Sequence, residues 1–176
     1  MCASTILLDS FIRTIPDFPQ KGIQFKDITP LLNDAEAFKL CIETFSSHLS
    51  SLSFSAIVAV ESRGFIFGSA LAYAMGKRLV LVRKRNKLPA EVHSLEYDLE
   101  YGTDILEIHK DALHPKDNVL LIDDLLATGG TVGAVEKLIH LCGAKVYAIA
   151  FLIELCFLNG RKNLKCENII SLLKYD

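Results

Sequence analysis

Residues 119–131 read Val-Leu-Leu-Ile-Asp-Asp-Leu-Leu-Ala-Thr-Gly-Gly-Thr, and this stretch decides the fold of the chain. The run Val119–Ile122 is apolar throughout, which predicts a short buried strand. Apolar residues then recur at helical spacing after the glycines, at Val135, Leu138 and Ile139. The stretch therefore predicts a strand, an acidic pair, a glycine loop and a helix, in that order.

Each part of this unit suits one part of a sugar phosphate. Glycines let the backbone approach a ligand closely, and a helix that begins there offers free N–H groups and a positive dipole end to a phosphate. Asp123 and Asp124 would repel the same phosphate, so we expect them to hold sugar hydroxyls or a metal-bound ligand. The candidate phosphate-binding residues are Ala127, Thr128, Gly129, Gly130 and Thr131.

Taken singly, these features have simpler explanations. A Gly-Gly pair alone is usually a turn, and an Asp-Asp pair alone is usually a solvated loop or a helix cap. The complete order of strand, acids, glycines and helix is much more specific. The chain contains neither the G-x-x-x-x-G-K-[ST] loop of nucleotide triphosphatases nor the G-x-G-x-x-G dinucleotide fingerprint.

Length and composition predict one globular α/β domain over residues 1–176. The 176 residues are 51% apolar and 23% charged, which is enough for a sizeable core. A net charge of −2 gives no support for nucleic-acid binding. The longest apolar run, Val146–Ile153, is far shorter than the roughly 20 residues that span a bilayer, so no membrane partner is expected. The five cysteines include no CxxC pair, which favours free thiols in a reducing cytoplasm.

Hydrophobic patterns predict the order of the elements. Strands are expected near 56–60, 79–82, 119–122 and 144–154, and their separation by helices predicts a mostly parallel sheet. Right-handed crossovers would then bring Glu61, Arg83 and Asp123 to one edge of that sheet. A helix over residues 7–15, a helix capped by Asn33 or Asp34, a long loop over 90–103 and a final strand over 169–175 complete the prediction.

The run Asp123–Thr131 resembles the phosphoribosyl pyrophosphate motif of type I phosphoribosyltransferases. Further stretches resemble the adenine-specific members of that family, namely Phe18–Leu32, Glu61–Phe65, Arg83–Pro89, Leu99–Gly102 and Glu154–Arg161. The resemblance implies the type I phosphoribosyltransferase fold, a central mostly parallel sheet flanked by helices. It also implies a small hood from about residues 1–34 and a mobile catalytic loop over about 84–104.

The resemblance assigns a site for adenine to the hood. Phe25 would stack on the base, backbone groups near Gln24 would read its edge, and Leu155 would cover its other face. Lys26 stands where many relatives have arginine, so it keeps the charge but lacks the planar fork. Without the resemblance, the stretch around Phe25 would be a packed surface loop and Leu155 a core residue.

The resemblance also assigns pyrophosphate contacts to Arg63, Arg83 and Lys87. A surface pair between Arg63 and Glu61 is the simpler alternative, and a run of cations such as Arg83–Lys87 is usually a solvated face. In the family the loop around Arg63 often contains a cis peptide, which would fall at Glu61–Ser62.

The catalytic glutamate of the family lies in the motif Leu-Glu-Tyr-Gly, which places it at Glu100. Glu96-Tyr97 is a partial echo of this motif, so Glu96 stays an alternative. By resemblance Glu100 would act as the general acid or base at the purine. Mg2+ is expected as the cofactor, held mainly by the substrate near Asp123 and Asp124, and a homodimer is expected because family members usually form one.

The resemblance therefore implies the conversion of adenine and 5-phosphoribosyl 1-pyrophosphate to AMP and pyrophosphate, a reaction of purine salvage. A transferase for another base would share the central motif but not the stretch around Phe25. A regulator built on the same fold would bind phosphoribosyl pyrophosphate without turnover and usually carries a DNA-binding domain. A two-metal phosphatase would need more carboxylates than Asp123 and Asp124 supply.

Overall fold

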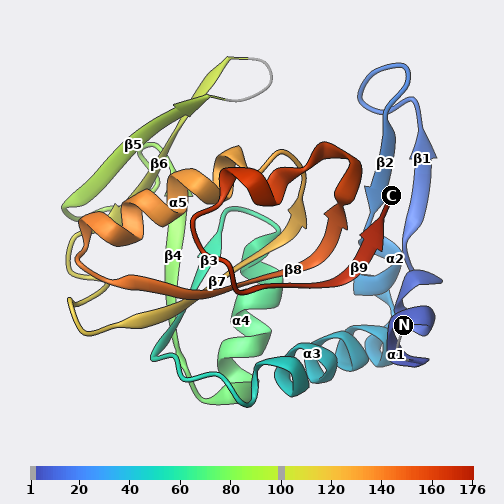
Figure 1. Cartoon of the computed structure of the whole chain (residues 1–176), viewed down its shortest axis with the longest axis horizontal. Helices are drawn as coiled ribbons and strands as arrows, with labels where there is room; N and C mark the ends of the chain where they lie inside the picture. Colours follow the sequence, from blue (N-terminus) through green and yellow to red (C-terminus); the bar gives the residue numbers. More distant parts are fainter. Residues whose placement is uncertain (1–2, 99–101) are drawn as a thin grey trace.

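A seven-stranded sheet in the order β5-β6-β4-β3-β7-β8-β9 forms the centre of the computed structural model, which describes residues 3–98 and 102–176 (Figure 1). Its strands are β3 (Ala56–Val60), β4 (Arg78–Lys84), β5 (Val92–Asp98), β6 (Thr103–His109), β7 (Asn118–Leu126), β8 (Lys145–Leu155) and β9 (Ile169–Tyr175). Strands β4, β3, β7, β8 and β9 run parallel, whereas β6 joins β4 antiparallel and β5 joins β6 antiparallel. The predicted mostly parallel α/β sheet is confirmed.

Helices cover both faces of this sheet (Figure 1). Helices α3 (Ala35–Leu49) and α4 (Gly64–Met75) lie on one face, and α5 (Gly130–Leu141) lies on the other. The central strands alternate between two cores, with Ile57 and Ala59 in one and Val58 and Val60 in the other. The predicted cap of α3 is confirmed at Asp34, whose Oδ1 accepts the Ala37 N–H at 2.9 Å. Across residues 3–98 and 102–176, no helix has the length and apolar character needed to cross a membrane.

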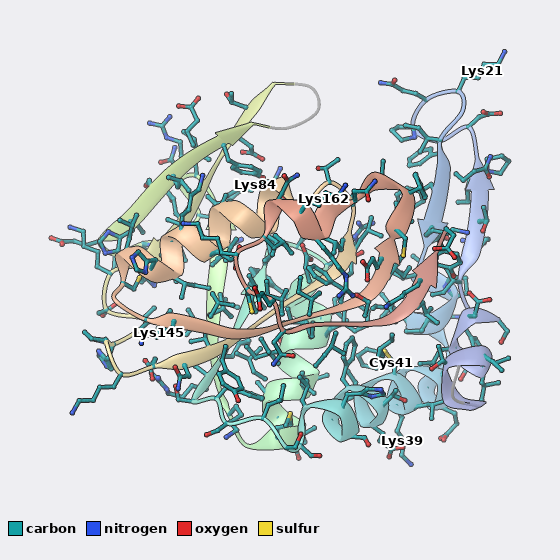
Figure 2. The ribbon with its side chains drawn as sticks, viewed as in Figure 1. Lys21, Lys39, Cys41, Lys84, Lys145 and Lys162 are labelled. Carbon is teal, nitrogen blue, oxygen red and sulfur yellow. The ribbon has the colours of Figure 1, made fainter. Side chains whose placement is uncertain are left out.

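Residues 3–33 form a small unit beside β9 (Figure 1), and Leu8, Ile28 and Leu31 of this unit join the hydrophobic core on the α3 and α4 face of the sheet. It contains α1 (Ala3–Asp9), β1 (Arg13–Pro16), β2 (Gln24–Asp27) and α2 (Thr29–Asn33), and the two strands pair only with each other in the described part of the chain. Lys21 extends outward from the tip of the β1–β2 hairpin (Figure 2).

The predicted helix over residues 7–15 is wrong after Asp9. Ser10 ends it, because its hydroxyl donates to the Leu7 carbonyl at 2.7 Å and its N–H bonds the same carbonyl at 3.2 Å. Ile15 lies instead in β1, opposite Phe25.

A β-hairpin replaces the long loop predicted over residues 90–103. Strands β5 and β6 pair in continuous register from Val92–His109 to Asp98–Thr103, so the prediction of irregular structure is wrong here. Leu95 and Tyr97 face the α5 side of the core, while Glu96 between them and Ser94 before them are polar. Two inward side chains were too few to reveal the two-residue period of a strand. Residues 99–101, which include Glu100, lie outside the described residues.

Candidate active site

The acidic pair lies inside β7, which continues through Leu126 rather than ending at Ile122 as predicted. Asp123 pairs with Phe151 of β8, so the sheet holds the backbone of the pair in place. The Asp124 N–H donates to Asp123 Oδ1 at 2.9 Å. The start of α4 packs against the same carboxylate, since a Cβ on Gly64 would lie 2.9 Å from Asp123 Oδ1. A side chain at position 64 would therefore displace the acid.

Arg63 balances part of the negative charge of this pair. Its Nε lies 2.8 Å from Asp124 Oδ2, and the carboxylate is buried while the arginine is partly exposed. Burial, reinforced by the neighbouring charge of Asp124, raises the pKa of Asp123 well above its usual range. Burial also raises the pKa of Asp124, although the Arg63 guanidinium works against this shift. The acidic pair therefore resists holding two negative charges, and a nearby cation or hydroxyl donor would favour the charged form.

The glycine loop is held by backbone contacts to a distant segment. Gly129 has a φ of +83°, and a Cβ there would lie 2.5 Å from the Gly160 carbonyl oxygen. Asn163 supports the same loop, since its Nδ2 donates to the Thr128 carbonyl at 2.7 Å. Helix α5 begins at Gly130 without a side-chain cap, which leaves its first N–H groups for a ligand. The loop from Ala127 to Thr131 therefore has the form of a phosphate cradle.

Gly160 and Asn163 were not identified as functional from the sequence. They lie in the short 3₁₀ helix η2 (Gly160–Asn163), which follows η1 (Cys156–Leu158) after β8. The only signal was the Gly160-Arg161 pair within the stretch that resembles the family. Gly160 and Asn163 support the glycine loop through contacts between distant segments of the chain, and no local sequence pattern predicts such contacts.

The two arginines predicted for pyrophosphate have different carboxylate partners. Arg83 Nη2 lies 3.3 Å from Glu61 Oε1, while Arg63 pairs with Asp124. The simpler alternative, a pair between Arg63 and Glu61, is therefore not the one formed. Glu61 Oε2 also accepts the Lys84 N–H at 2.8 Å. Burial alone would raise the pKa of Glu61, but the Lys84 N–H and the Arg83 charge lower it.

Glu61 therefore ties the end of β3 to the end of β4, a role that the sequence did not reveal. The peptide bond between Glu61 and Ser62 is cis, as the resemblance implied. Arg83 Nη1 donates to the Lys87 carbonyl at 3.1 Å, which folds the following turn back on the strand end. The Lys87 side chain is exposed at that turn.

Phe25, which is predicted to stack on the base, lies close to Arg63 and therefore to the acidic pair. The Phe25 ring packs edge-on against Phe18, with ring centroids 5.1 Å apart. The Arg63 guanidinium carbon lies 5.8 Å from the Phe25 ring centroid. Arg63 thus joins the acidic pair to the hairpin that carries Phe25. Leu155 ends β8, and Gln24 begins β2 with an exposed side chain.

The Lys26 side chain lies against Tyr175 and not with the other residues predicted to bind the base. Its ammonium lies 3.9 Å from the centroid of the Tyr175 ring and donates to Thr14 Oγ1 at 3.0 Å. Any part that Lys26 plays at the base would therefore come from its backbone, which the sequence could not distinguish from its side chain.

An acidic pair inside a strand, a glycine loop opening on a helix and two arginines at neighbouring strand ends define an enzyme that handles phosphoribosyl groups. In agreement, the phosphoribosyl transferase domain family matches residues 28–167. At 54% identity, covering 97% of this chain and 98% of the relative, the chain is similar to the adenine phosphoribosyltransferase of Thermosipho melanesiensis. The chain belongs to the adenine phosphoribosyltransferase family.

Solved structures agree with this assignment. The crystal structure of adenine phosphoribosyltransferase from Thermoanaerobacter pseudethanolicus superposes with a TM-score of 0.94 at 54% identity, covering 97% of this chain and 99% of that one. The Saccharomyces cerevisiae enzyme, complexed with an imino-altritol bisphosphate and adenine, gives a TM-score of 0.94 at 36% identity, covering 98% and 99%. The predicted fold, family and enzyme class are confirmed, while the roles of single residues stay predictions.

Proposed function

We propose that this site transfers the 5-phosphoribosyl group of phosphoribosyl pyrophosphate to adenine, giving AMP and pyrophosphate in purine salvage. The observation that carries the proposal is the position of Arg63, which contacts Asp124 on one side and lies against Phe25 on the other. One arginine therefore links the candidate sugar-phosphate site to the candidate base site. In this proposal residues 1–176 act as one domain, with residues 1–34 forming the hood over the base.

The phosphoribosyl group would lie between the glycine loop and the acidic pair. The loop from Ala127 to Thr131 would receive the 5′-phosphate at the start of α5. Asp123 and Asp124 would accept the ribose hydroxyls and offset the positive charge that develops on the ring as the bond to pyrophosphate breaks. Their electrostatic role needs no side-chain movement, because β7 and α4 already fix them.

Pyrophosphate would leave toward the cationic strand ends. Arg63 and Arg83 are both partly exposed and each is held by one carboxylate, so they are oriented before the ligand arrives. Lys87 would add a third charge from the turn after β4. These cations would stabilise the leaving group as its negative charge grows.

The acidic pair fits a magnesium ion that is bound together with the substrate. Mg2+ usually keeps several waters and binds through one or two carboxylates and substrate phosphates rather than a full protein cage. Asp123 and Asp124 would hold the ion, and its positive charge would stabilise the leaving group.

Adenine would enter between Phe25 and Leu155. The Phe25 ring supplies a flat apolar face, and backbone groups near Gln24 can supply both a donor and an acceptor to the edge of the base. Residues 1–27, which include β1 and β2, lie outside the match to the general phosphoribosyl transferase domain. The match to the adenine phosphoribosyltransferase of Thermosipho melanesiensis covers 97% of this chain and so extends into this region, which supports its part in choosing the base.

The proposed function is tested by measuring pyrophosphate release with Mg2+ and phosphoribosyl pyrophosphate. Adenine, hypoxanthine, guanine and xanthine are supplied separately. Turnover confined to adenine is expected. Turnover of another base would discard the role of Phe25 but keep the acidic site. Binding of phosphoribosyl pyrophosphate without turnover of any base would support a regulator instead.

Replacing Glu100 with glutamine should lower kcat by about 10²-fold, because a neutral amide cannot exchange a proton with the purine. The affinity for both substrates should stay within about threefold, since glutamine keeps the size and hydrogen-bonding reach of glutamate. Steady-state kinetics and direct binding of phosphoribosyl pyrophosphate would measure this. Glu96→Gln is the matched control, because Glu96 lies in β5 and should leave kcat unchanged. The reverse outcome would move the catalytic role to Glu96.

The expected assembly is a homodimer formed through α4 and β4. Tyr73, 92% exposed, and Ile66 lie two helical turns apart on α4, and Leu79 and Leu81 lie beside them on β4 with more than a third of their surfaces exposed. A Cβ on Gly68 of α4 would lie 3.5 Å from Leu79 Cδ1, so the two elements share this surface. Such an apolar face favours a second copy of the chain.

A Tyr73→Asp substitution should weaken this dimer by about 100-fold, because it places a charge in an apolar contact. Sedimentation velocity at micromolar concentration would detect the change. Tyr147→Asp is the control, since Tyr147 is 41% exposed on β8, away from this face. A wild-type protein that sediments as a monomer would contradict the proposal.

A reducing cytoplasm is the expected compartment. Cys41 and Cys142 are buried free thiols, and Cys156 and Cys166 are partly buried free thiols. Burial raises the pKa of Cys41 to about 12, so this thiol stays protonated and unreactive. The thiols of the described chain therefore behave as small apolar side chains rather than as a disulfide framework.

A further inference from the structure

Side-chain contacts hold the β1–β2 hairpin in position beside the seven-stranded sheet, and the contact between Arg63 and Phe25 is one of them. Its two strands hydrogen-bond to each other and form a sheet distinct from the seven-stranded one. Figure 1 shows the hairpin standing beside the end of β9. Because Phe25 must lie at a fixed distance from Leu155 to enclose a flat base, something must set the spacing between the hairpin and the sheet.

Tyr175 lies where these two parts meet. The Lys26 ammonium of β2 lies 3.9 Å from the Tyr175 ring centroid, within the range of a cation–π interaction. The same ammonium donates to Thr14 Oγ1 of β1 at 3.0 Å, so both strands of the hairpin are engaged. The Tyr175 hydroxyl donates to Asp9 Oδ1 at 2.5 Å. Tyr175 therefore connects β9 to α1 and to the hairpin.

The contact between Lys26 and Tyr175 lies next to Phe25 and Leu155, the two residues expected to enclose adenine. Lys26 follows Phe25 directly in the chain, and adjacent residues of a strand point to opposite faces. Tyr175 is the partner of Leu155 in the register of β8 and β9. A shift of Lys26 relative to Tyr175 would thus change the separation of Phe25 and Leu155 directly.

The hydroxyl of Tyr175 is a stable donor in this position. Burial, together with the hydrogen bond to Asp9, raises the pKa of Tyr175 above its usual range. It therefore stays protonated across the pH range in which enzymes are assayed. Tyr175 packs against the edge of the hydrophobic core and also borders a cavity of about 570 Å3 lined in part by Asp9 and His48.

We infer that Tyr175 is a positioning residue for adenine binding, which holds the β1–β2 hairpin through Lys26 and Asp9 so that Phe25 faces Leu155 across the base. The inference rests on the proposed function, because it assumes that these two residues enclose adenine. It assigns to Tyr175 no contact with either substrate. The Lys26 side chain becomes part of the same support, which explains why it faces away from the Arg63 cluster.

The test compares Michaelis constants for the two substrates. Tyr175→Leu removes the ring and should raise the KM for adenine by about 5–10-fold, the range expected for one lost cation–π contact. The KM for phosphoribosyl pyrophosphate should change by less than about twofold, because the glycine loop and acidic pair are untouched. Tyr175→Phe keeps the ring under Lys26 and should raise the KM for adenine by less than about threefold. Tyr147→Leu is the matched control, because it removes a half-exposed tyrosine from the neighbouring strand β8, and it should change neither Michaelis constant.

A double variant distinguishes a positioning role of Tyr175 from a general effect on the stability of the protein. If Tyr175 acts through Lys26, then adding Lys26→Met to Tyr175→Leu should raise the KM for adenine little further, because the contact is already lost. Equal rises in both Michaelis constants, or a loss of thermal stability with unchanged constants, would overturn the inference. If Tyr175→Leu fails to fold, Lys26→Met and Tyr175→Phe give the same comparison. Wild-type enzyme that does not turn over adenine would instead refute the proposed function.

Discussion

Replacing Asp123 with asparagine should lower kcat about 10³-fold and, at neutral pH, raise the melting temperature by about 2–4 °C. Activity falls because the amide cannot offset the positive charge that develops on the ribose ring. Stability rises because the native carboxylate is buried beside Asp124, which raises its pKa well above the usual value. Asparagine keeps the Oδ1 that accepts the Asp124 N–H, so the local backbone is preserved.

The pH dependence of this effect has a definite sign. An acid whose pKa is raised in the folded state binds its proton more tightly when folded, so its ionisation costs stability. The cost is absent at acidic pH below the usual pKa of 3.8 and grows as the pH rises through the folded pKa. The variant should therefore match the wild type in acid and exceed it at neutral pH. Calorimetry at several pH values, with pyrophosphate release at each, would measure both effects.

Asp124→Asn is the matched comparison. It removes the same charge, but it also removes the partner of Arg63, whose Nε lies 2.8 Å from Asp124 Oδ2. We therefore expect loss of activity without the gain in stability. A variant Asp123→Asn with kcat within about tenfold of the wild type would contradict the electrostatic role of that acid. Equal stability changes in the two variants would contradict the partnership of Arg63 and Asp124.

A Gly129→Ala substitution should lower kcat/KM for phosphoribosyl pyrophosphate by more than about 10²-fold, because a 1 Å displacement of a positioning loop can cost that much. Two causes act together. The backbone of Gly129 has a φ of +83°, and a Cβ there would lie 2.5 Å from the Gly160 carbonyl oxygen. Both groups in this clash belong to the backbone, so the loop itself has to move. Binding of phosphoribosyl pyrophosphate by calorimetry would report the change directly.

Gly76→Ala separates conformational strain from the clash. Gly76 ends α4 with a φ of +61°, but a Cβ there would meet no atom within 4 Å. This variant should lose about 1 kcal/mol of stability and keep its affinity for phosphoribosyl pyrophosphate. If Gly129→Ala loses no more affinity than Gly76→Ala, then the contact with Gly160 does not position the phosphate loop.

The sequence predicted the parts of the fold that depend on buried periodic patterns. Strand β3 and helix α3 were placed correctly because each buries one continuous apolar pattern. Strand β7 was predicted too short, because aspartates are unfavourable in strands and hid the pairing of Asp123 with Phe151. Strand β5 was missed because it lies at the edge of the sheet and turns only Leu95 and Tyr97 toward the core that buries Leu106 and Ile108 of β6.

The residues of the candidate site also fall into two groups, those that a local sequence pattern predicts and those that depend on contacts between distant segments. The residues of the acidic pair and glycine loop follow one another in the chain, so a motif was enough to find them. The sequence predicted that Glu61 and Arg83 would lie at one edge of the sheet, but the contacts of Glu61 with Arg83 and with the Lys84 backbone depend on the parallel pairing of β3 and β4 in space. Asn163 and Tyr175 act on residues 35 or more positions away, at Thr128 and Lys26. Contacts of that kind leave no local pattern in a single sequence.

The separate β1–β2 sheet has a consequence for how specificity can evolve. The residues expected to handle the sugar and its phosphates lie on the seven-stranded sheet and its loops. The ring expected to recognise the base lies on a hairpin that contacts the rest of the chain through side chains such as Lys26 and Phe25. Mutations can therefore accumulate in residues 13–27 without disturbing the strands that hold the acids. Preference for one purine over another becomes a property that can be exchanged almost as a module, while the chemistry of bond breaking is inherited unchanged.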